Sequence, residues 1–262
     1  MNVACTSVAL VVMLGTAGCG AVVGKGPEGP AESAATEKCP VQEHAMGLRW
    51  QQQSAEAQAL QSQTYRIAAE RLKEKVEQSD STNLAIITDL DETAIDNTDL
   101  LARDMSSCHD YSDWDTWGDW ELNGSPSAIP GATQFLHQAD AMGVSIYYLS
   151  DRTEENLEAT IASLTKLDFP QVSTDHVRLL GPSKEERRTK IQEEHQVIMQ
   201  LGDTLHDFAG DYAKTDLDRQ RQLVEEDAER FGDDWFILPN PTYGSWEDAE
   251  LDEWDAKLDV KK

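Results

Sequence analysis

The sequence predicts an α/β fold built around a mostly parallel sheet. Short apolar runs rich in β-branched residues alternate with longer stretches of helical spacing, which is typical of strands alternating with helices. Gly, Pro and polar clusters separate these segments. The chain has 262 residues, 39% of them hydrophobic, which is enough for one ordinary to large domain with a core.

The first third of the chain predicts helix, then strand. Apolar residues recur at helical spacing over 45–76, which indicates one long or two shorter helices. A strand is expected over 84–88, and 89–97 is the loop after it. Residues 98–130 show no clear period, and a helix over 133–141 should stop at Gly143.

The alternation continues to the C-terminus. A strand over 144–149 precedes a helix over 154–167. Three further strands are predicted, over residues 177–180, 197–201 and 235–238. Ser183 and Glu186 have the form of a capping box, so a helix should begin there and run to about residue 196. A final helix is expected to carry Leu251, Trp254 and Leu258 on one face.

The first residues predict targeting rather than fold. An apolar run over residues 8–14 is too short to span a membrane, and residues 1–18 are interpreted as a signal peptide. The small residues before Cys19 resemble the lipobox of bacterial lipoproteins, so we expect a lipid on Cys19 that attaches the protein to a membrane. The alternative is an ordinary cleaved signal with an incidental cysteine. Residues 19–43, rich in Gly, Ala, Pro and Glu, read as a flexible linker.

Composition limits the partners. Lys and Arg number 22 and Asp and Glu number 49, which gives a formal charge of -27. Such a surface repels polyanions, so a nucleic acid polymer is excluded as a partner, and a phosphate site needs local cations. After removal of the signal, Cys39 and Cys108 remain besides Cys19; they could pair, but the sequence does not determine it. Their spacing does not favour a zinc site, and no oligomeric state is predicted.

Several polar residues should meet at one edge of the sheet. Asp89, Asp91, Ser150 and Asp203 follow predicted strands, and Lys184 begins a helix. In parallel sheets, ligands bind outside the carboxyl ends of the strands. Acids two residues apart repel each other, and a hard cation such as Mg²⁺ removes that conflict. An EF-hand is excluded by pattern, because, with Asp89 as the first position, the sixth is Ala94 and not Gly, and the twelfth is Leu100 and not Glu.

Five motifs occur in the order of a known family. Asp-Leu-Asp-Glu-Thr from Asp89, with Asp96-Asn97, resembles the first motif of the haloacid dehalogenase (HAD) superfamily, and more narrowly that of the bacterial class C acid phosphatases, the lipoprotein e type. Four later segments resemble the second, third, fourth and C-terminal motifs of that family, in this order: Ser150-Asp151-Arg152, Lys184 in Ser-Lys-Glu-Glu-Arg-Arg, residues 202–208 and residues 238–246. The similarity extends from about Trp50 to Trp246.

The resemblance implies a fold and an activity. It implies a Rossmann-like core with a smaller helical, cap-like part, so that residues 44–262 form the catalytic domain, with cap-like elements at about 44–80 and 98–130. The implied activity is Mg²⁺-dependent acid phosphomonoesterase, or 5′-nucleotidase. Nucleoside 5′-monophosphates, including nicotinamide mononucleotide, and other small phosphomonoesters would be hydrolysed through an aspartyl-phosphate. An outer-membrane lipoprotein facing the periplasm or the surface is the implied location.

The resemblance also assigns roles to residues. Asp89 would be the nucleophile and Asp91 the general acid and base. The Mg²⁺ site would consist of Asp89, Asp91 through its backbone carbonyl, Asp203 and Asp207, which orients the metal's waters. The substrate-binding residues would be Ser150, Arg152, Lys184, Trp114 and Tyr243. Two alternatives stay open: a surface lipoprotein that binds a phosphorylated ligand without turnover, and a phosphotransferase that uses an alcohol instead of water.

Overall fold

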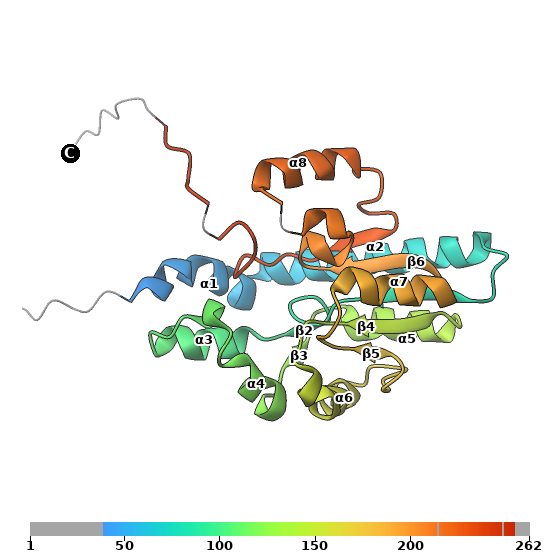
Figure 1. Cartoon of the computed structure of the whole chain (residues 1–262), viewed down its shortest axis with the longest axis horizontal. Coiled ribbons are helices and arrows are strands. Elements are labelled where there is room, and N and C mark those ends of the chain that lie inside the picture. The colour runs from blue at the N-terminus through green and yellow to red at the C-terminus, as the bar shows by residue number, and fades with distance from the viewer. Residues whose placement is uncertain (1–38, 214, 248, 255–262) are drawn as a thin grey trace, which may run out of the picture. The chain divides into compact units, whose positions relative to one another are not determined.

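The computed structural model describes residues 39–213, 215–247 and 249–254 (Figure 1). The chain from Cys39 onward forms a compact unit of its own. The predicted signal peptide, Cys19 and the linker up to residue 38 lie outside the described residues. The last residues of the predicted linker belong to a 3-10 helix, η1 (Pro40–His44), whose Val41 is buried. Within the described residues, no helix has the length and apolar character needed to cross a membrane.

The centre of the fold is a five-stranded parallel sheet, which confirms the predicted α/β class. Its strands in spatial order are β5 (Val177–Arg178), β4 (Ser145–Leu149), β1 (Leu84–Thr88), β6 (Gln196–Gly202) and β7 (Trp235–Ile237). The chain moves from β1 outward to β5 on one side and then returns to β6 on the other. This reversal opens a crevice at the carboxyl end of β1.

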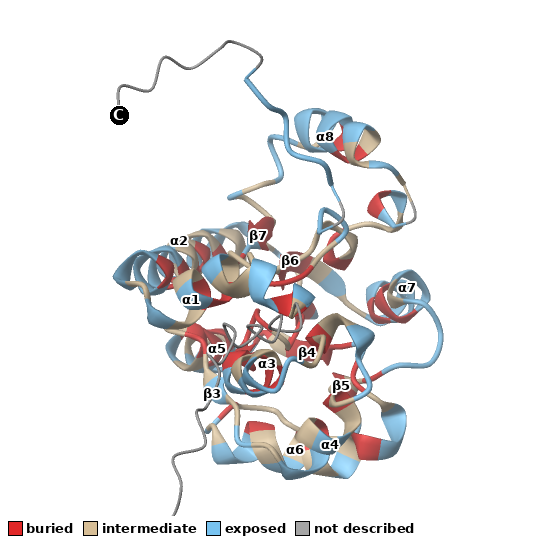
Figure 2. Ribbon diagram, turned by 90° about the vertical axis from the view of Figure 1, so that its left-hand side faces the viewer, coloured by how far each residue is buried: buried red, intermediate tan, exposed pale blue. Residues whose placement is uncertain are grey.

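Each face of the sheet is covered by different helices. Side chains alternate along a strand, so Ile86 faces one way and its neighbours Ala85 and Ile87 the other. Ile86 belongs to the larger core with α2 (Ala55–Gln78) and α5 (Ala132–Ala141), whereas Ala85 and Ile87 pack with Ile191 of α7 (Lys184–Glu194). Figure 2 shows the buried residues gathered on the strands and on the inner sides of the helices. Each fully buried aliphatic side chain contributes about 1.5–3 kcal/mol.

The helices follow the sequence prediction closely where their period is clear. The first predicted helical stretch is two helices, α1 (Ala45–Gln53) and α2, because Ser54 leaves the helical conformation and caps α2 by accepting a hydrogen bond from the N–H of Ala57. The helix predicted over 154–167 is a 3-10 turn, η3 (Glu154–Asn156), followed by α6 (Leu157–Lys166). The predicted capping box of α7 (Lys184–Glu194) is confirmed, with both of its hydrogen bonds present.

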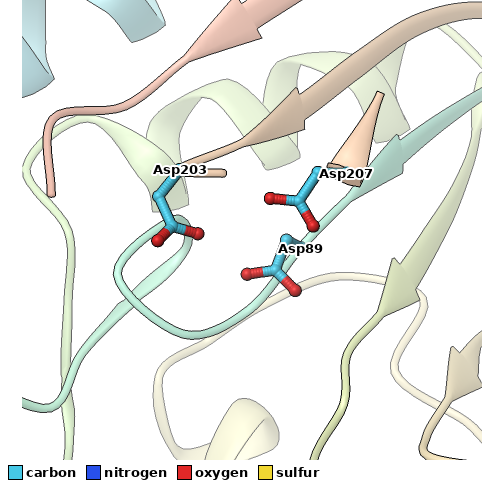
Figure 3. Close-up of side chains that lie close together, drawn as sticks. All are labelled: Asp89, Asp203 and Asp207. Carbon is cyan, nitrogen blue, oxygen red and sulfur yellow. The ribbon is translucent and has the colours of Figure 1, made fainter. Parts of the chain in front are cut away.

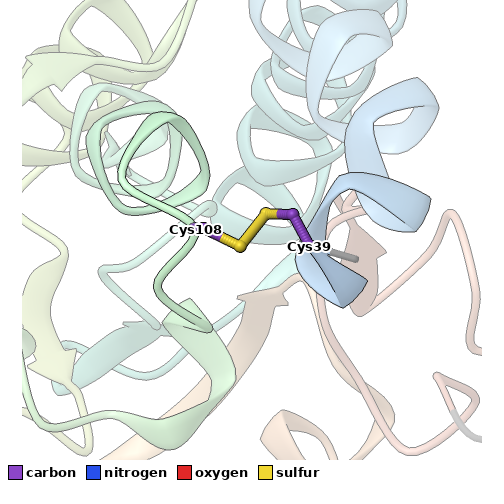
Figure 4. Close-up of a disulfide and its surroundings, with 2 residues drawn as sticks. All are labelled: Cys39 and Cys108. Atoms are coloured by element: carbon purple, nitrogen blue, oxygen red, sulfur yellow. A yellow bond between two sulfur atoms is a disulfide. The ribbon is translucent and has the colours of Figure 1, made fainter. Parts of the chain in front are cut away.

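Residues 98–130, which show no period in the sequence, form short elements. These are α3 (Thr98–Ser106), η2 (Tyr111–Asp113), α4 (Trp117–Asn123) and β3 (Ser127–Ala128), which pairs with β2 (Ile95–Asp96). Tertiary contacts hold them: Tyr111 donates to the carbonyl of Thr242 at 2.8 Å. Cys39 and Cys108 form a disulfide with their Cα atoms 5.4 Å apart (Figure 4). One or two helical turns carry too few residues for a period to be recognised.

The C-terminal third contains the remaining differences. Two 3-10 turns, η4 (Leu205–Asp207) and η5 (Gly210–Tyr212), and a helix, α8 (Leu217–Glu226), lie between β6 and β7, where no element was predicted. The predicted final helix is wrong over residues 251–254, which are irregular. Leu251 is 91% exposed and Trp254 73% exposed, so their apolar side chains have no surface that would stabilise a short helix. Leu258 lies outside the described residues.

Candidate active site

The carboxyl ends of the central strands bring the predicted site residues together. Asp89 directly follows β1, and its backbone N–H donates to the carbonyl of Leu201 in β6 at 2.9 Å. Asp203 directly follows β6, and Ser150 directly follows β4. Lys184 begins α7, at the same edge of the sheet. The parallel topology therefore places four separate sequence motifs in one crevice.

Three carboxylates form an acid cluster, consisting of Asp89, Asp203 and Asp207 (Figure 3). One oxygen of each lies within 4.8 Å of one oxygen of the other two. Asp203 is held by two donors, the hydroxyl of Thr93 at 3.1 Å and the amide of Asn240 at 2.8 Å. These bonds fix the carboxylate orientation from two segments that are far apart in the sequence.

Asp207 is fixed by the turn that carries it. The Thr204 backbone N–H and hydroxyl both donate to Asp207 Oδ2, at 3.0 and 2.8 Å. The turn passes so close to β6 that a Cβ on Gly202 would lie 2.3 Å from the Asp207 Cβ. Glycine is therefore required at residue 202, since any side chain there would push Asp207 out of the cluster.

Lys184 neutralises part of this negative charge. Its ammonium donates to Asp89 Oδ1 at 2.7 Å and to Asp207 Oδ1 at 2.5 Å. Burial opposes the charged form of Lys184, but the two carboxylates dominate and raise its pKa. For Asp207 the same ammonium outweighs the cost of burial, so the pKa of Asp207 is lowered. Lys184 is therefore a local cation at the crevice, of the kind that a phosphate site on such an acidic protein needs.

The acid cluster carries more negative charge than Lys184 balances. Burial, followed by the charge of Asp207, raises the pKa of Asp203 to about 8. Burial also raises the pKa of Asp89 despite the attraction of Lys184. Buried carboxylate oxygens that repel one another are the donor set of a hard divalent cation. Asp89, Asp203 and Asp207 thus fit a divalent metal, which would relieve the repulsion.

Asp91 points away from the acid cluster. Its carboxylate accepts from Arg152 Nε at 2.9 and 3.2 Å, from the amide of Asn97 at 2.9 Å and from the Ser150 hydroxyl at 3.1 Å. The Asp91 carboxylate is therefore not part of the acid cluster, and the metal contact expected through its backbone carbonyl stays a prediction. The Asp91 side chain remains 17% exposed and lines the cleft.

Two predicted substrate-binding residues beside Asp91, Arg152 and Ser150, are bound to protein groups. The Arg152 side chain is 1% exposed, and its guanidinium is bound to Asp91 and to the side-chain oxygen of Asn97, Oδ1, at 3.0 Å. Ser150 is fully buried. The structure assigns both residues a role in holding Asp91, and their contact with substrate stays a prediction.

Aromatic rings also line the crevice. We define this aromatic wall as Trp114, Trp117 and Tyr243. The ring of Trp114 is 5.1 Å from that of Tyr243 and is half exposed, whereas the other two rings are almost buried. Trp114 adopts a left-handed backbone conformation (φ 62°), which turns the chain between η2 and α4. An exposed ring held by buried rings is suited to stacking a planar group.

The acid cluster and the aromatic wall border one cleft of about 1280 Å³. Its lining includes Asp89, Asp91, Lys184, Asp203, Trp114 and Tyr243. Seven of the predicted site residues, with Arg152 as the seventh, therefore line a single cavity. Of the other two, Asp207 belongs to the acid cluster, and Ser150 is buried and donates to Asp91.

Sequence reasoning left some residues of the site without a role. Glu92 and Asn97, which belong to the first motif, and Asn240, which belongs to the last, all bond to site residues. Their position inside the motifs was the available signal. Their partners could not be inferred, because each bond joins segments that only the tertiary structure brings together.

Comparison with known proteins identifies the family. Residues 31–246 match the family model described as HAD superfamily, subfamily IIIB (acid phosphatase). The solved class C acid phosphatase from Bacillus anthracis is 33% identical, with a TM-score of 0.77, and the match covers 81% of this chain and 89% of that one. A structure titled as the same enzyme with tungstate bound is 31% identical, with a TM-score of 0.77, covering 83% and 94%.

These similarities agree with the order of the five motifs and with the parallel sheet. The family match covers most of the chain, including every residue of the acid cluster and the aromatic wall. The chain therefore belongs to subfamily IIIB of the HAD superfamily and is a class C acid phosphatase, an enzyme that hydrolyses phosphomonoesters.

Proposed function

We propose that the protein is a Mg²⁺-dependent phosphatase that hydrolyses nucleoside 5′-monophosphates, nicotinamide mononucleotide among them, through an aspartyl-phosphate. The observation that carries this proposal is the shared cleft. A buried carboxylate, Asp89, faces the same space as a half-exposed Trp114, so one ligand can reach both. A phosphate at the acid cluster and a planar base at the aromatic wall would match this arrangement.

The nucleophile in this proposal is Asp89. One Asp89 oxygen attacks phosphorus, the bond from phosphorus to the ester oxygen breaks, and an aspartyl-phosphate forms. Lys184, bound to Asp89 Oδ1, keeps the carboxylate in place and supplies positive charge next to the phosphoryl oxygens. A divalent metal held by Asp89, Asp203 and Asp207 would offset the repulsion between the carboxylate and the phosphate.

Asp91 is the proton donor and acceptor in this proposal. It gives a proton to the ester oxygen as the bond breaks, so that the leaving group departs as an alcohol. It then removes a proton from water, whose oxygen attacks phosphorus and displaces Asp89 as a free carboxylate. Bonds from Arg152, Asn97 and Ser150 hold the Asp91 carboxylate in one orientation for both steps.

The relative with tungstate supports an oxyanion site in this fold. Tungstate is a tetrahedral oxyanion like phosphate, and it is bound by the Bacillus anthracis enzyme. By analogy, the phosphoryl group of a substrate would occupy the end of the cleft near Asp89 and Lys184. The leaving group would then extend toward Trp114, where each stacked base contributes about 1–3 kcal/mol.

The experiment compares three substrates with and without metal. Phosphate release is measured from nicotinamide mononucleotide, adenosine monophosphate and ethyl phosphate at mildly acidic pH, with Mg²⁺ and with chelator. We expect metal-dependent release and a higher kcat/KM for both nucleotides. Release without preference would retain the chemistry and reject the stacking role of the aromatic wall. No release would indicate a protein that binds a phosphorylated ligand without turnover.

We also propose that the enzyme is an outer-membrane lipoprotein attached through Cys19. The support is the lipobox-like sequence together with the disulfide between Cys39 and Cys108, since disulfides persist in oxidising compartments. Cys19→Ser should move the enzyme from the membrane fraction to the soluble fraction of the envelope. An unchanged membrane fraction would reject the anchor.

A further inference from the structure

Glu92 is a buried carboxylate that the proposed chemistry does not use. It is 0% exposed, lies outside the acid cluster and does not line the cleft. Its backbone has a left-handed conformation (φ 54°), which is unfavourable for a residue with a side chain. A residue held in this conformation and fully buried must be stabilised by its contacts, so the partners of its carboxylate indicate what it does.

One partner is the aromatic wall. The hydroxyl of Tyr243 donates to Glu92 Oε2 across 151 residues of sequence. Tyr243 is almost buried, and its ring packs against Trp114 at 5.1 Å. The bond is buried, so breaking it would leave a polar group without a partner inside the protein, which is costly. Glu92 therefore fixes the position of the ring that supports the exposed Trp114.

The other partner is the residue that holds the general acid. Glu92 Oε1 accepts from the Asn97 backbone N–H at 2.9 Å and from the Asn97 amide at 3.3 Å. The same amide donates to Asp91 Oδ1 at 2.9 Å. The side-chain oxygen of Asn97, Oδ1, accepts from Arg152 at 3.0 Å and from the Trp120 indole at 2.8 Å. Asn97 thus has a single orientation, and Glu92 stabilises it.

We propose that Glu92 is a positioning residue that fixes the general acid Asp91, through Asn97, relative to the aromatic wall, through Tyr243. The proton donor and the ring of the leaving group then keep one fixed separation during the reaction. Small displacements of reacting groups are costly, about 100-fold in rate for 1 Å. This inference rests on the proposed roles of Asp91 and Tyr243, and it adds the device that connects them.

The test uses leaving groups that differ in their need for a proton. The leaving group of ethyl phosphate is a strongly basic ethoxide unless its oxygen is protonated. The leaving group of p-nitrophenyl phosphate, p-nitrophenolate, is weakly basic and departs without a proton. Glu92→Gln keeps the side-chain size. We expect it to lower kcat/KM for ethyl phosphate about 10-fold more than kcat/KM for p-nitrophenyl phosphate. This is part of the rate acceleration of about 100- to 10,000-fold that general acid catalysis supplies in total. Because kcat/KM reports steps up to the first bond cleavage, the later hydrolysis does not hide this ratio.

Further variants separate the two connections of Glu92, the one through Asn97 to Asp91 and the one to Tyr243. Asn97→Ala removes the side-chain link to Asp91 and should reproduce the leaving-group bias. Tyr243→Phe removes only a hydroxyl and should raise KM for nucleotides more than for ethyl phosphate. A double variant, Glu92→Gln with Asn97→Ala, should show the same bias as the single variants, because both remove one connection. If Glu92→Gln does not fold, Asn97→Ala and Tyr243→Phe carry the test.

The control is Tyr148→Phe, which also removes a buried hydroxyl, one that donates to the Pro170 carbonyl at 2.7 Å and does not bond to Glu92, Asn97 or Asp91. It should change both substrates equally. Equal losses for both substrates in Glu92→Gln and Asn97→Ala would overturn the positioning role. Asp91→Asn distinguishes this from failure of the proposed function: if it also shows no bias, the assignment of Asp91 as general acid is wrong.

Discussion

The acid cluster and the aromatic wall border the same cleft but are built in different ways. The residues of the acid cluster directly follow central strands or lie in short turns beside them, and hydrogen bonds fix each carboxylate. The aromatic wall consists of residues from short helices and loops, held by ring contacts and by the disulfide at Cys108. The acid cluster at the carboxyl ends of the strands therefore determines where the phosphoryl group reacts, whereas the aromatic wall determines which leaving groups fit.

This difference separates chemistry from selectivity. A change in the acid cluster should lower kcat for every substrate, because each phosphomonoester presents the same phosphoryl group. A change in the aromatic wall should raise KM only for substrates that carry a ring. The following predictions test that separation.

The largest expected effect is the loss of the nucleophile. Asp89→Asn should lower kcat by about 10,000-fold or more for nucleotide and alkyl substrates alike, since the amide cannot form the covalent intermediate. Phosphate release is the measurement, with circular dichroism to verify the fold. Asp140→Asn, the same change at an exposed residue on α5, is the matched control. Near-normal turnover by Asp89→Asn would show that another group attacks phosphorus.

The second prediction concerns how two buried carboxyl groups, Asp203 of the acid cluster and Glu92 outside it, affect stability without metal. The pKa of Asp203 is raised from 3.8 to about 8 and that of Glu92 from 4.5 to about 8, mainly by burial. Between about pH 4 and pH 8, the folded protein keeps the protons on these two groups, whereas the unfolded chain has lost them. The contribution of the two groups to the free energy of unfolding is therefore greatest below about pH 4. It falls as the pH rises to about 8, by an amount of the order of a few kcal/mol.

Thermal unfolding in chelator at pH 5 and pH 8 measures this effect. We expect a lower midpoint at pH 8, a smaller difference in Asp203→Asn and a smaller difference with Mg²⁺, which binds the ionised carboxylates. The lowered pKa of Asp207 and the raised pKa of Lys184 act outside this range of pH. A midpoint that rises from pH 5 to pH 8 without metal would contradict the description of the cluster as overcharged.

The third prediction concerns the aromatic wall. Trp114→Ala should raise KM for nucleotides by roughly 5- to 150-fold, equivalent to about 1–3 kcal/mol, because the exposed ring that stacks the base is lost. KM for ethyl phosphate should change little, since that leaving group has no ring. Trp254→Ala removes another exposed tryptophan, one that does not line the cleft, and serves as control. Equal losses for both substrates would indicate that Trp114 supports the fold and not the substrate.

The two regions also differ in how far the sequence predicts them. Asp89 and Asp203 could be placed together because parallel strands bring their carboxyl ends to one edge, and the motifs identified which strands matter. The orientation of Asp91 toward Arg152 could not be predicted, because a charged pair of this kind depends on side-chain directions. The bond between Tyr243 and Glu92 also escaped prediction, since a loop of no regular structure brings the tyrosine back to the first motif.

The smallest expected effect on catalysis comes from the disulfide. Cys39 and Cys108 are 69 residues apart, so the link stabilises the folded protein by about 4 kcal/mol in the chain-entropy model. It ties the segment between α3 and the turn that presents Trp114 to the start of η1, outside the strands that carry the acid cluster. The double variant Cys39→Ser with Cys108→Ser should therefore lower the unfolding midpoint.

In that variant, below its unfolding midpoint, KM for nucleotides should rise only about 2- to 5-fold, because ring contacts and the bond from Tyr111 to Thr242 still hold the wall, and such a change corresponds to less than about 1 kcal/mol. The kcat for ethyl phosphate should stay the same. A fall in that kcat would mean that the cap-like segment also positions the acid cluster. The aromatic wall would then be part of the catalytic apparatus and not only of the selectivity of the enzyme.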